Sequence, residues 1–182
     1  MPQKGFTLLE MIVALGVFAV AALLSASSLL SLTDAQRKAY ALQSAYDNLR
    51  FALETIAKDA RTGNVFYCGA DADDLPLVPT PKDCPSGGPA LTYNKAPGDN
   101  ASGDVVAYRV FQGRIDKFTG GALSGTLTSS DINITNLTFY VLGAPLGDDF
   151  QPRIAIVIKG TAGSGRTVSN FNLQTTISQR KV

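Results

Sequence analysis

The chain has 182 residues, with 16 basic and 15 acidic side chains, two cysteines and neither histidine nor tryptophan. Its length favours one domain with an appended segment, and its near-zero charge argues against a strongly basic, nucleic-acid-binding domain. Without histidine it lacks the usual general base and the commonest metal ligand, and two cysteines cannot build a four-thiolate zinc site. We therefore predict no catalytic residue, no metal, no cofactor and no nucleic-acid partner.

Apolar residues are concentrated at the N-terminus. Of the first 32 residues, 21 are apolar, and only Lys4 and Glu10 are charged. The stretch 11–32 contains no charge, and as a helix it measures about 33 Å, which matches a hydrocarbon core of ~30 Å. We therefore expect residues 6–32 to form a membrane-spanning helix.

Two alternatives to a membrane span are a cleaved secretory signal peptide and a buried core helix. Glu10 stands where the apolar region of a signal peptide would begin, and the helical pattern continues past the apolar run. A core helix is normally shorter and has polar residues at a helical period. Glu10 and the continued helical pattern argue against a signal peptide, and the length of the apolar run argues against a core helix. We therefore favour the membrane span.

The sequence GFTLLE at residues 5–10, after a short leader that contains Lys4, resembles the prepilin peptidase motif of type IV pilins and type II secretion pseudopilins. The resemblance implies that residues 1–5 are a leader, that the chain is cut between Gly5 and Phe6, and that Phe6 is then N-methylated. Prepilin peptidase, which also methylates, is the implied processing partner.

Glu10 is the one carboxylate within the apolar segment. A charge in that position is costly and usually functional. In a filament of the family it would pair with the terminal ammonium of a neighbouring subunit and so favour assembly in register. The alternative is a glutamate that the membrane interface merely tolerates.

Residues 33–63 continue the helix as an amphipathic segment. No proline occurs between Pro2 and Pro76, and good helix formers are abundant. Apolar side chains form one stripe: Leu42, Tyr46, Leu49, Leu53, Ile56 and Ala60. We expect this stripe to pack on the protein's own sheet, with a coiled-coil seam as the alternative, and Asp59 to face solvent on the opposite side. Gly63 should end the helix.

Residues 64–104 are predicted to form a surface loop. Six of the nine prolines lie within it, together with a cluster of acids at Asp71, Asp73 and Asp74. Cys68 and Cys84 would lie outside the cytosol in the implied topology, where a disulfide between them is expected and worth ~3 kcal/mol. The acid cluster suggests calcium, but its spacing departs from the usual calcium loop, and solvated carboxylates are the better interpretation.

Residues 105–182 read as antiparallel strands. Segments 105–111 and 114–118 flank Gln112-Gly113, a hairpin signal, and alternating or β-branched strands follow at 137–141, 153–159 and 168–178. One long helix followed by strands predicts an α+β fold. The pilin fold is similar: a long N-terminal membrane-spanning helix whose C-terminal half packs on an antiparallel sheet.

The resemblance implies a non-enzymatic structural subunit, a minor pilin or pseudopilin, most similar to the J type. Its partners would be the inner membrane, other pilin or pseudopilin subunits, and the assembly platform with its ATPase. The globular domain would be periplasmic or extracellular. The alternatives are a membrane-tethered DNA-uptake or adhesion domain, and an anchored protein that never polymerises.

Overall fold

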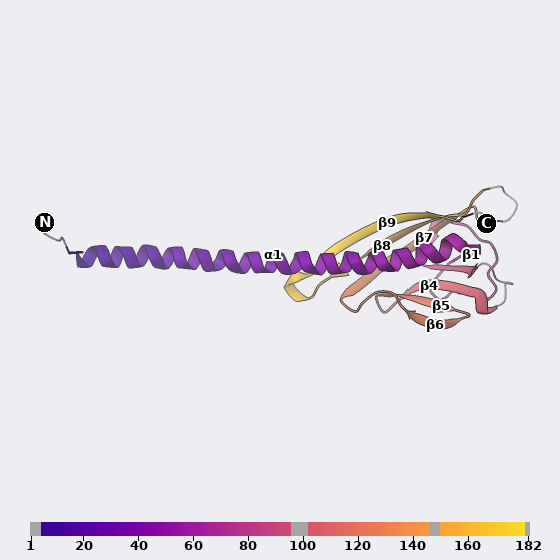
Figure 1. Ribbon diagram of the computed structural model, residues 1–182, viewed down its shortest axis with the longest axis horizontal. Coiled ribbons are helices and arrows are strands. Elements are labelled where there is room, and N and C mark those ends of the chain that lie inside the picture. The colour runs from indigo at the N-terminus through magenta and orange to yellow at the C-terminus, as the bar shows by residue number, and fades with distance from the viewer. Residues whose placement is uncertain (1–4, 96–101, 146–149, 181–182) are drawn as a thin grey trace.

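The computed structural model describes residues 5–95, 102–145 and 150–180. Its dominant element is α1 (Leu8–Thr62), a single helix of 55 residues that extends for about 82 Å. The N-terminal part of α1 projects far beyond the rest of the protein, whereas its C-terminal part lies against the sheets (Figure 1). The predicted long helix is confirmed, although it begins at Leu8 rather than at Phe6.

Within the described residues, nine strands form two antiparallel sheets. The five-stranded sheet has the order β1-β3-β4-β5-β6 and the four-stranded sheet the order β2-β7-β8-β9. In Figure 1 the four-stranded sheet lies above α1 and most of the five-stranded sheet lies below it. Their bounds are β1 (Gly63–Gly69), β2 (Cys84–Gly88), β3 (Ala90–Lys95), β4 (Val105–Phe111), β5 (Arg114–Thr119), β6 (Ala122–Thr126), β7 (Ile132–Leu142), β8 (Arg153–Ala162) and β9 (Ser169–Ser178). Two 3-10 turns complete the fold, η1 (Ser102–Asp104) and η2 (Gly165–Thr167).

The α+β class and the antiparallel pairing are confirmed, and two expectations need correction. The segment 64–104 is not one surface loop, because it contributes β1, β2 and β3, and β3 is buried over most of its length. The strands are also divided between two sheets rather than joined in one. Three of the prolines that suggested a loop, Pro76, Pro79 and Pro81, lie between β1 and β2, where backbone N–H groups are not needed for a ladder.

The hairpin at Gln112-Gly113 forms as predicted. Both residues have positive φ, 49° and 73°, as a two-residue type I′ turn requires. β4 and β5 pair in continuous register on either side of it, from Val106–Thr119 to Phe111–Arg114. Strand β6, which the sequence did not reveal, then pairs with β5 and forms an exposed edge.

The core lies between the C-terminal part of α1 and the two sheets. Its largest fully buried side chains include Phe66, Tyr93 and Tyr108 from the five-stranded sheet and Phe139 and Ile156 from the four-stranded sheet. From α1 the buried residues are Ala45, Leu49, Ala52, Ile56 and Ala60. The helix therefore packs on the protein's own sheets, as expected.

The buried face of α1 is rotated from the predicted stripe. Ala45 and Ala52 are buried, whereas Tyr46 is 43% exposed and Leu42 and Leu53 are only partly buried. Small alanine side chains let the helix approach the strands closely, and the larger Tyr46 would keep them apart. The prediction followed a seven-residue spacing, which correctly included Leu49, Ile56 and Ala60 but left out Ala45 and Ala52.

Candidate processing and assembly site

The predicted processing site is uncovered. A Cβ atom added at Gly5 would meet no atom within 4 Å, and the neighbouring Phe6 side chain is 83% exposed. The Gly5–Phe6 peptide bond is therefore accessible in the isolated subunit, as a peptidase substrate requires. Most of the predicted leader, residues 1–4 with Lys4, lies outside the described residues.

Thr7 and Glu10 form a capping box at the start of α1. The Glu10 N–H donates to Thr7 Oγ1 at 3.2 Å, and the Thr7 N–H donates to Glu10 Oε2 at 3.1 Å. The Thr7 hydroxyl also donates to this carboxylate, at 3.1 Å. These bonds satisfy N–H groups that a helix start leaves free, and the helix dipole favours a carboxylate here. This capping role of Glu10 was not predicted, although the T-x-x-E pattern is the sequence signature of a capping box.

The part of α1 that follows this cap, residues 8–32, is exposed throughout. Within the described residues, α1 is the one helix long and apolar enough to cross a membrane, and none of its most apolar window is buried. Three of its serines, Ser25, Ser27 and Ser28, each donate to the carbonyl four residues earlier, at 2.8–3.0 Å. These hydroxyl groups are therefore satisfied within the helix, as polar groups in hydrocarbon must be.

Cys68 and Cys84 form the predicted disulfide, with their Cα atoms 5.9 Å apart. The bond joins β1 to β2 and therefore one sheet to the other. It also closes the base of residues 70–83, which we call the strap. Leu77 of the strap lines a small pocket together with Ala107 of β4 and Phe118 of β5. A Cβ atom added at Gly121, in the turn after β5, would lie 2.6 Å from Leu77 Cδ2.

The acids of the strap act as local structural groups. Asp73 pairs with Arg109, whose guanidinium carbon lies 5.0 Å from the centre of the Phe118 ring. Asp74 accepts hydrogen bonds from the Ala70 N–H and the Tyr67 hydroxyl, at 2.9 and 2.8 Å. These two bonds lower the pKa of Asp74, and the same carboxylate raises the pKa of Tyr67. Within the described residues, no three or more acidic, histidine or cysteine side chains are grouped to hold a metal.

A polar network joins the end of α1 to the five-stranded sheet, and the sequence analysis missed it. Asp59 accepts a hydrogen bond from the Tyr108 hydroxyl at 2.9 Å and pairs with the Lys117 ammonium. Burial, together with the negative charge of Asp59, raises the pKa of Tyr108. The expectation that Asp59 faces solvent is wrong, because its side chain is only 22% exposed.

Comparison with known proteins identifies the N-terminal segment. Residues 1–26 match a protein family described as the prokaryotic N-terminal methylation motif. Neither the search of curated proteins nor the search of solved structures gave a significant match. The match covers the predicted leader, Gly5, Phe6, Glu10 and most of the exposed apolar helix.

The matched motif marks a type IV pilin-like substrate of prepilin peptidase and suggests a structural, non-enzymatic subunit. It is followed by an exposed apolar helix that fits a membrane anchor, and by an α+β domain with two antiparallel sheets. The match covers only residues 1–26, and together with the fold it supports a relationship to type IV pilins and pseudopilins.

Proposed function

We propose that this protein is a minor pilin or pseudopilin of a type II secretion or type IV pilus filament, most similar to the J type. In this proposal the chain is stored in the inner membrane with its globular domain on the periplasmic or outer side. Prepilin peptidase cuts between Gly5 and Phe6 and methylates Phe6. An assembly platform with its ATPase then moves the subunit into a filament of other pilins or pseudopilins.

The proposal rests on one observation: the methylation motif stands at the start of a helix whose apolar N-terminal part contacts no other part of the protein. An unpartnered apolar face of about 25 residues is stable only in lipid or against other apolar helices. A membrane anchor needs only lipid around its helix, whereas a filament subunit needs lipid before assembly and neighbouring apolar helices after it. The long α1 supplies one continuous surface for the two states.

Processing is tested by mass spectrometry of the mature N-terminus in the native host. We expect a chain that begins at methylated Phe6. An intact Met1, or a start near residue 28, would instead favour the anchored protein that never polymerises or the ordinary signal peptide. Neighbouring genes for a secretion or a pilus machine would then distinguish the two filament types.

Within this proposal, Glu10 guides assembly by pairing with the terminal ammonium of a neighbouring Phe6. Because the capping box gives Glu10 a second role, the test must separate charge from capping. Glu10→Gln removes the charge and keeps a side chain that can still accept the Thr7 N–H. Thr7→Val removes the hydroxyl of the box and keeps the charge.

We expect Glu10→Gln to be cleaved normally and to enter filaments at less than about a tenth of the wild-type level, since breaking a buried ion pair typically costs ~3–5 kcal/mol. Thr7→Val should be cleaved and assembled. The measurement is immunoblotting of sheared filament fractions against total membrane protein. Normal assembly of Glu10→Gln would reject the pairing role, and a defect confined to Thr7→Val would assign assembly to the cap.

A further inference from the structure

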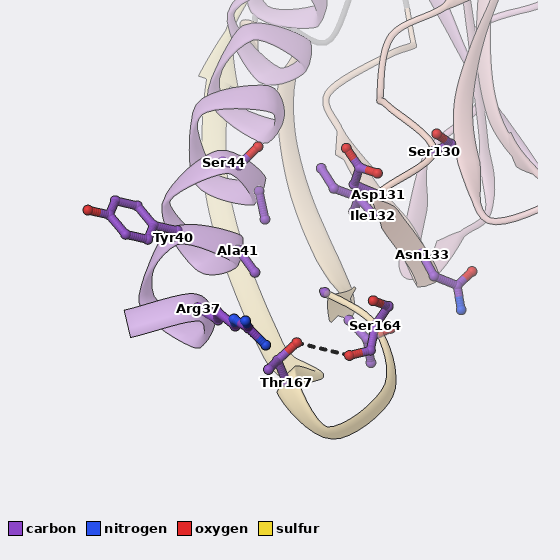
Figure 2. Close-up of a pocket in the computed structure, with 13 residues that line it drawn as sticks. Arg37, Tyr40, Ala41, Ser44, Ser130, Asp131, Ile132, Asn133, Ser164 and Thr167 are labelled. Carbon is purple, nitrogen blue, oxygen red and sulfur yellow. Dashed lines mark hydrogen bonds between the residues drawn. The ribbon is translucent and has the colours of Figure 1, made fainter. Parts of the chain in front are cut away.

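A pocket lined by both apolar and polar residues lies at the root of the globular domain, where α1 leaves the sheets. It is open to solvent on one side, has a volume of about 540 Å³ and is lined by α1, the turn before β7 and the turn between β8 and β9. Figure 2 shows Arg37, Tyr40 and Ser44 on the helix side, Asp131 on the wall opposite Ser44, and Ser164 and Thr167 at the end nearest Arg37. This volume lies within the range of small-molecule sites in proteins.

The pocket has a cationic side chain, Arg37, near one end and a carboxylate, Asp131, near the other. Within the described residues, neither Arg37 nor Asp131 takes part in a salt bridge. Arg37 precedes Ser44 by seven residues, about 10 Å along the helix. Figure 2 shows the guanidinium turned toward Thr167, whose hydroxyl donates to the Ser164 carbonyl at 2.9 Å. One end of the pocket therefore offers the Arg37 guanidinium to an anion, and the other offers the Asp131 carboxylate as an acceptor.

When α1 is inserted in a membrane, the end of the pocket that contains Arg37 lies at the height of the lipid head groups. The membrane insertion assumed here rests on the proposed function. Arg37 follows Leu32, the last apolar residue of the span, by five residues, which is about 7.5 Å. Helical side chains point back toward the N-terminus, and the head-group layer is roughly 5–8 Å thick. Tyr40, 71% exposed, is an aromatic residue of the kind that gathers at this interface.

We propose that this pocket binds the head group of a membrane phospholipid, namely a phosphodiester whose far end carries hydrogen-bond donors. The phosphate binds the Arg37 guanidinium, because Arg is suited to bidentate phosphate contacts. The ammonium or hydroxyl groups of the head group extend along α1 and donate to Asp131 and Ser44. A phosphate without such donors would leave Asp131 facing a second negative charge.

The choline head group provides a matched ligand control. Phosphatidylethanolamine and phosphatidylglycerol carry ammonium or hydroxyl donors beyond the phosphodiester, whereas phosphatidylcholine carries the same phosphodiester with no donor. The full chain is placed in phosphatidylcholine bicelles, and either donor lipid is titrated in. The amide NMR signals of Gly163, Ser164 and Thr167 report binding at the pocket.

We expect saturable shifts of these signals with a donor lipid and none in phosphatidylcholine alone. Arg37→Gln should weaken binding about tenfold, as expected for the loss of a charged hydrogen bond. Asp131→Asn should reduce the preference for donor lipids over phosphatidylcholine. The control is Lys38→Gln, which removes the same charge at the same height from a residue that does not line the pocket.

Three results would overturn the inference. Shifts that never saturate, or an equal loss in Lys38→Gln and Arg37→Gln, would mean general attraction to the membrane surface. Equal binding of glycerophosphoethanolamine in solution would mean a site for a free phosphodiester. A paramagnetic agent in the acyl chains should broaden residues 11–32, and failure to do so would count against the proposed membrane insertion rather than against the pocket.

Discussion

Asp59 shows how a single residue can acquire its role from distant partners. Its carboxylate binds Tyr108 and Lys117, which lie 49 and 58 residues further along the chain. The sequence pattern placed it among the charged residues on the solvent side of the helix. No local rule indicates these partners, because they are brought to Asp59 by the packing of β4 and β5 against α1.

Removing the Asp59 carboxylate should destabilise the domain. In Asp59→Ala the Lys117 ammonium and the Tyr108 hydroxyl lose their acceptor in a partly buried site, and the free energy of unfolding should fall by about 2–3 kcal/mol. Urea titration of the full chain in detergent micelles, followed by circular dichroism, measures this. Lys58→Ala, at the adjacent exposed position, should change it by less than about 0.5 kcal/mol. Equal effects of the two variants would contradict the assigned network.

Glu10 and the two cysteines could be singled out from the sequence, for different reasons. Glu10 stands out because a carboxylate in an apolar run is costly, and the cysteines because they are the only pair in the chain. The disulfide is confirmed, and the assembly role of Glu10 stays a prediction. What the sequence did not indicate about the disulfide is that it connects the two sheets.

At the level of elements, the junction between α1 and β1 depends on close packing at Gly63. The residue was expected to end the helix, and it does, but with an extended backbone at φ −74° rather than in the left-handed conformation. A Cβ at this position would lie 2.5 Å from Cδ2 of Tyr93. Glycine is therefore required by a neighbouring ring and not by its own backbone angles.

Gly63→Ala should be markedly destabilising. Tyr93 is fully buried, so its ring cannot move aside without disturbing the core, and overpacking of this kind typically costs ~1–3 kcal/mol. The thermal midpoint of the full chain in micelles reports the loss. Gly103→Ala is the matched control, since a Cβ there meets nothing within 4 Å. An unchanged midpoint in Gly63→Ala would show that the contact can relax.

At the scale of the whole molecule, buried tyrosines make the fold sensitive to alkaline conditions. Burial raises the pKa of Tyr93 and of Tyr108 above the ordinary value of 10.0, and the bond to Asp74 raises that of Tyr67. A group whose pKa is higher in the folded state stabilises the fold below its unfolded pKa. That contribution is lost as the pH rises toward the folded pKa.

We therefore expect stability to decline above about pH 10, with Tyr93 and Tyr108 ionising only as the domain unfolds. Absorbance at the phenolate band and far-ultraviolet circular dichroism, recorded over one pH titration, should show the last tyrosines ionising together with the loss of strand signal. Tyr40→Phe should leave the unfolding midpoint unchanged, because Tyr40 is exposed on α1. Ionisation of all six tyrosines before any loss of structure would contradict the prediction.

The two ends of the globular domain also meet only in the complete fold. The Arg180 N–H donates to the Arg61 carbonyl at 2.9 Å, and the Gln179 side chain donates to the Gly63 carbonyl at 2.7 Å. A helix end leaves carbonyl groups free, and here the segment after β9 satisfies one of the last-turn carbonyls. The C-terminal residues thus complete the helix junction.

The sequence by itself determined the features that depend on near neighbours. Local composition and spacing are enough to predict the motif at residues 5–10, the uninterrupted helix and the hairpin at Gln112-Gly113. The tertiary structure alone decided the division into two sheets, the burial of Ala45 and Ala52, the contacts of Asp59 and the pocket beside Arg37. Each of these depends on the distance between segments far apart in the chain, and such distances are fixed only when the helix and the sheets pack together.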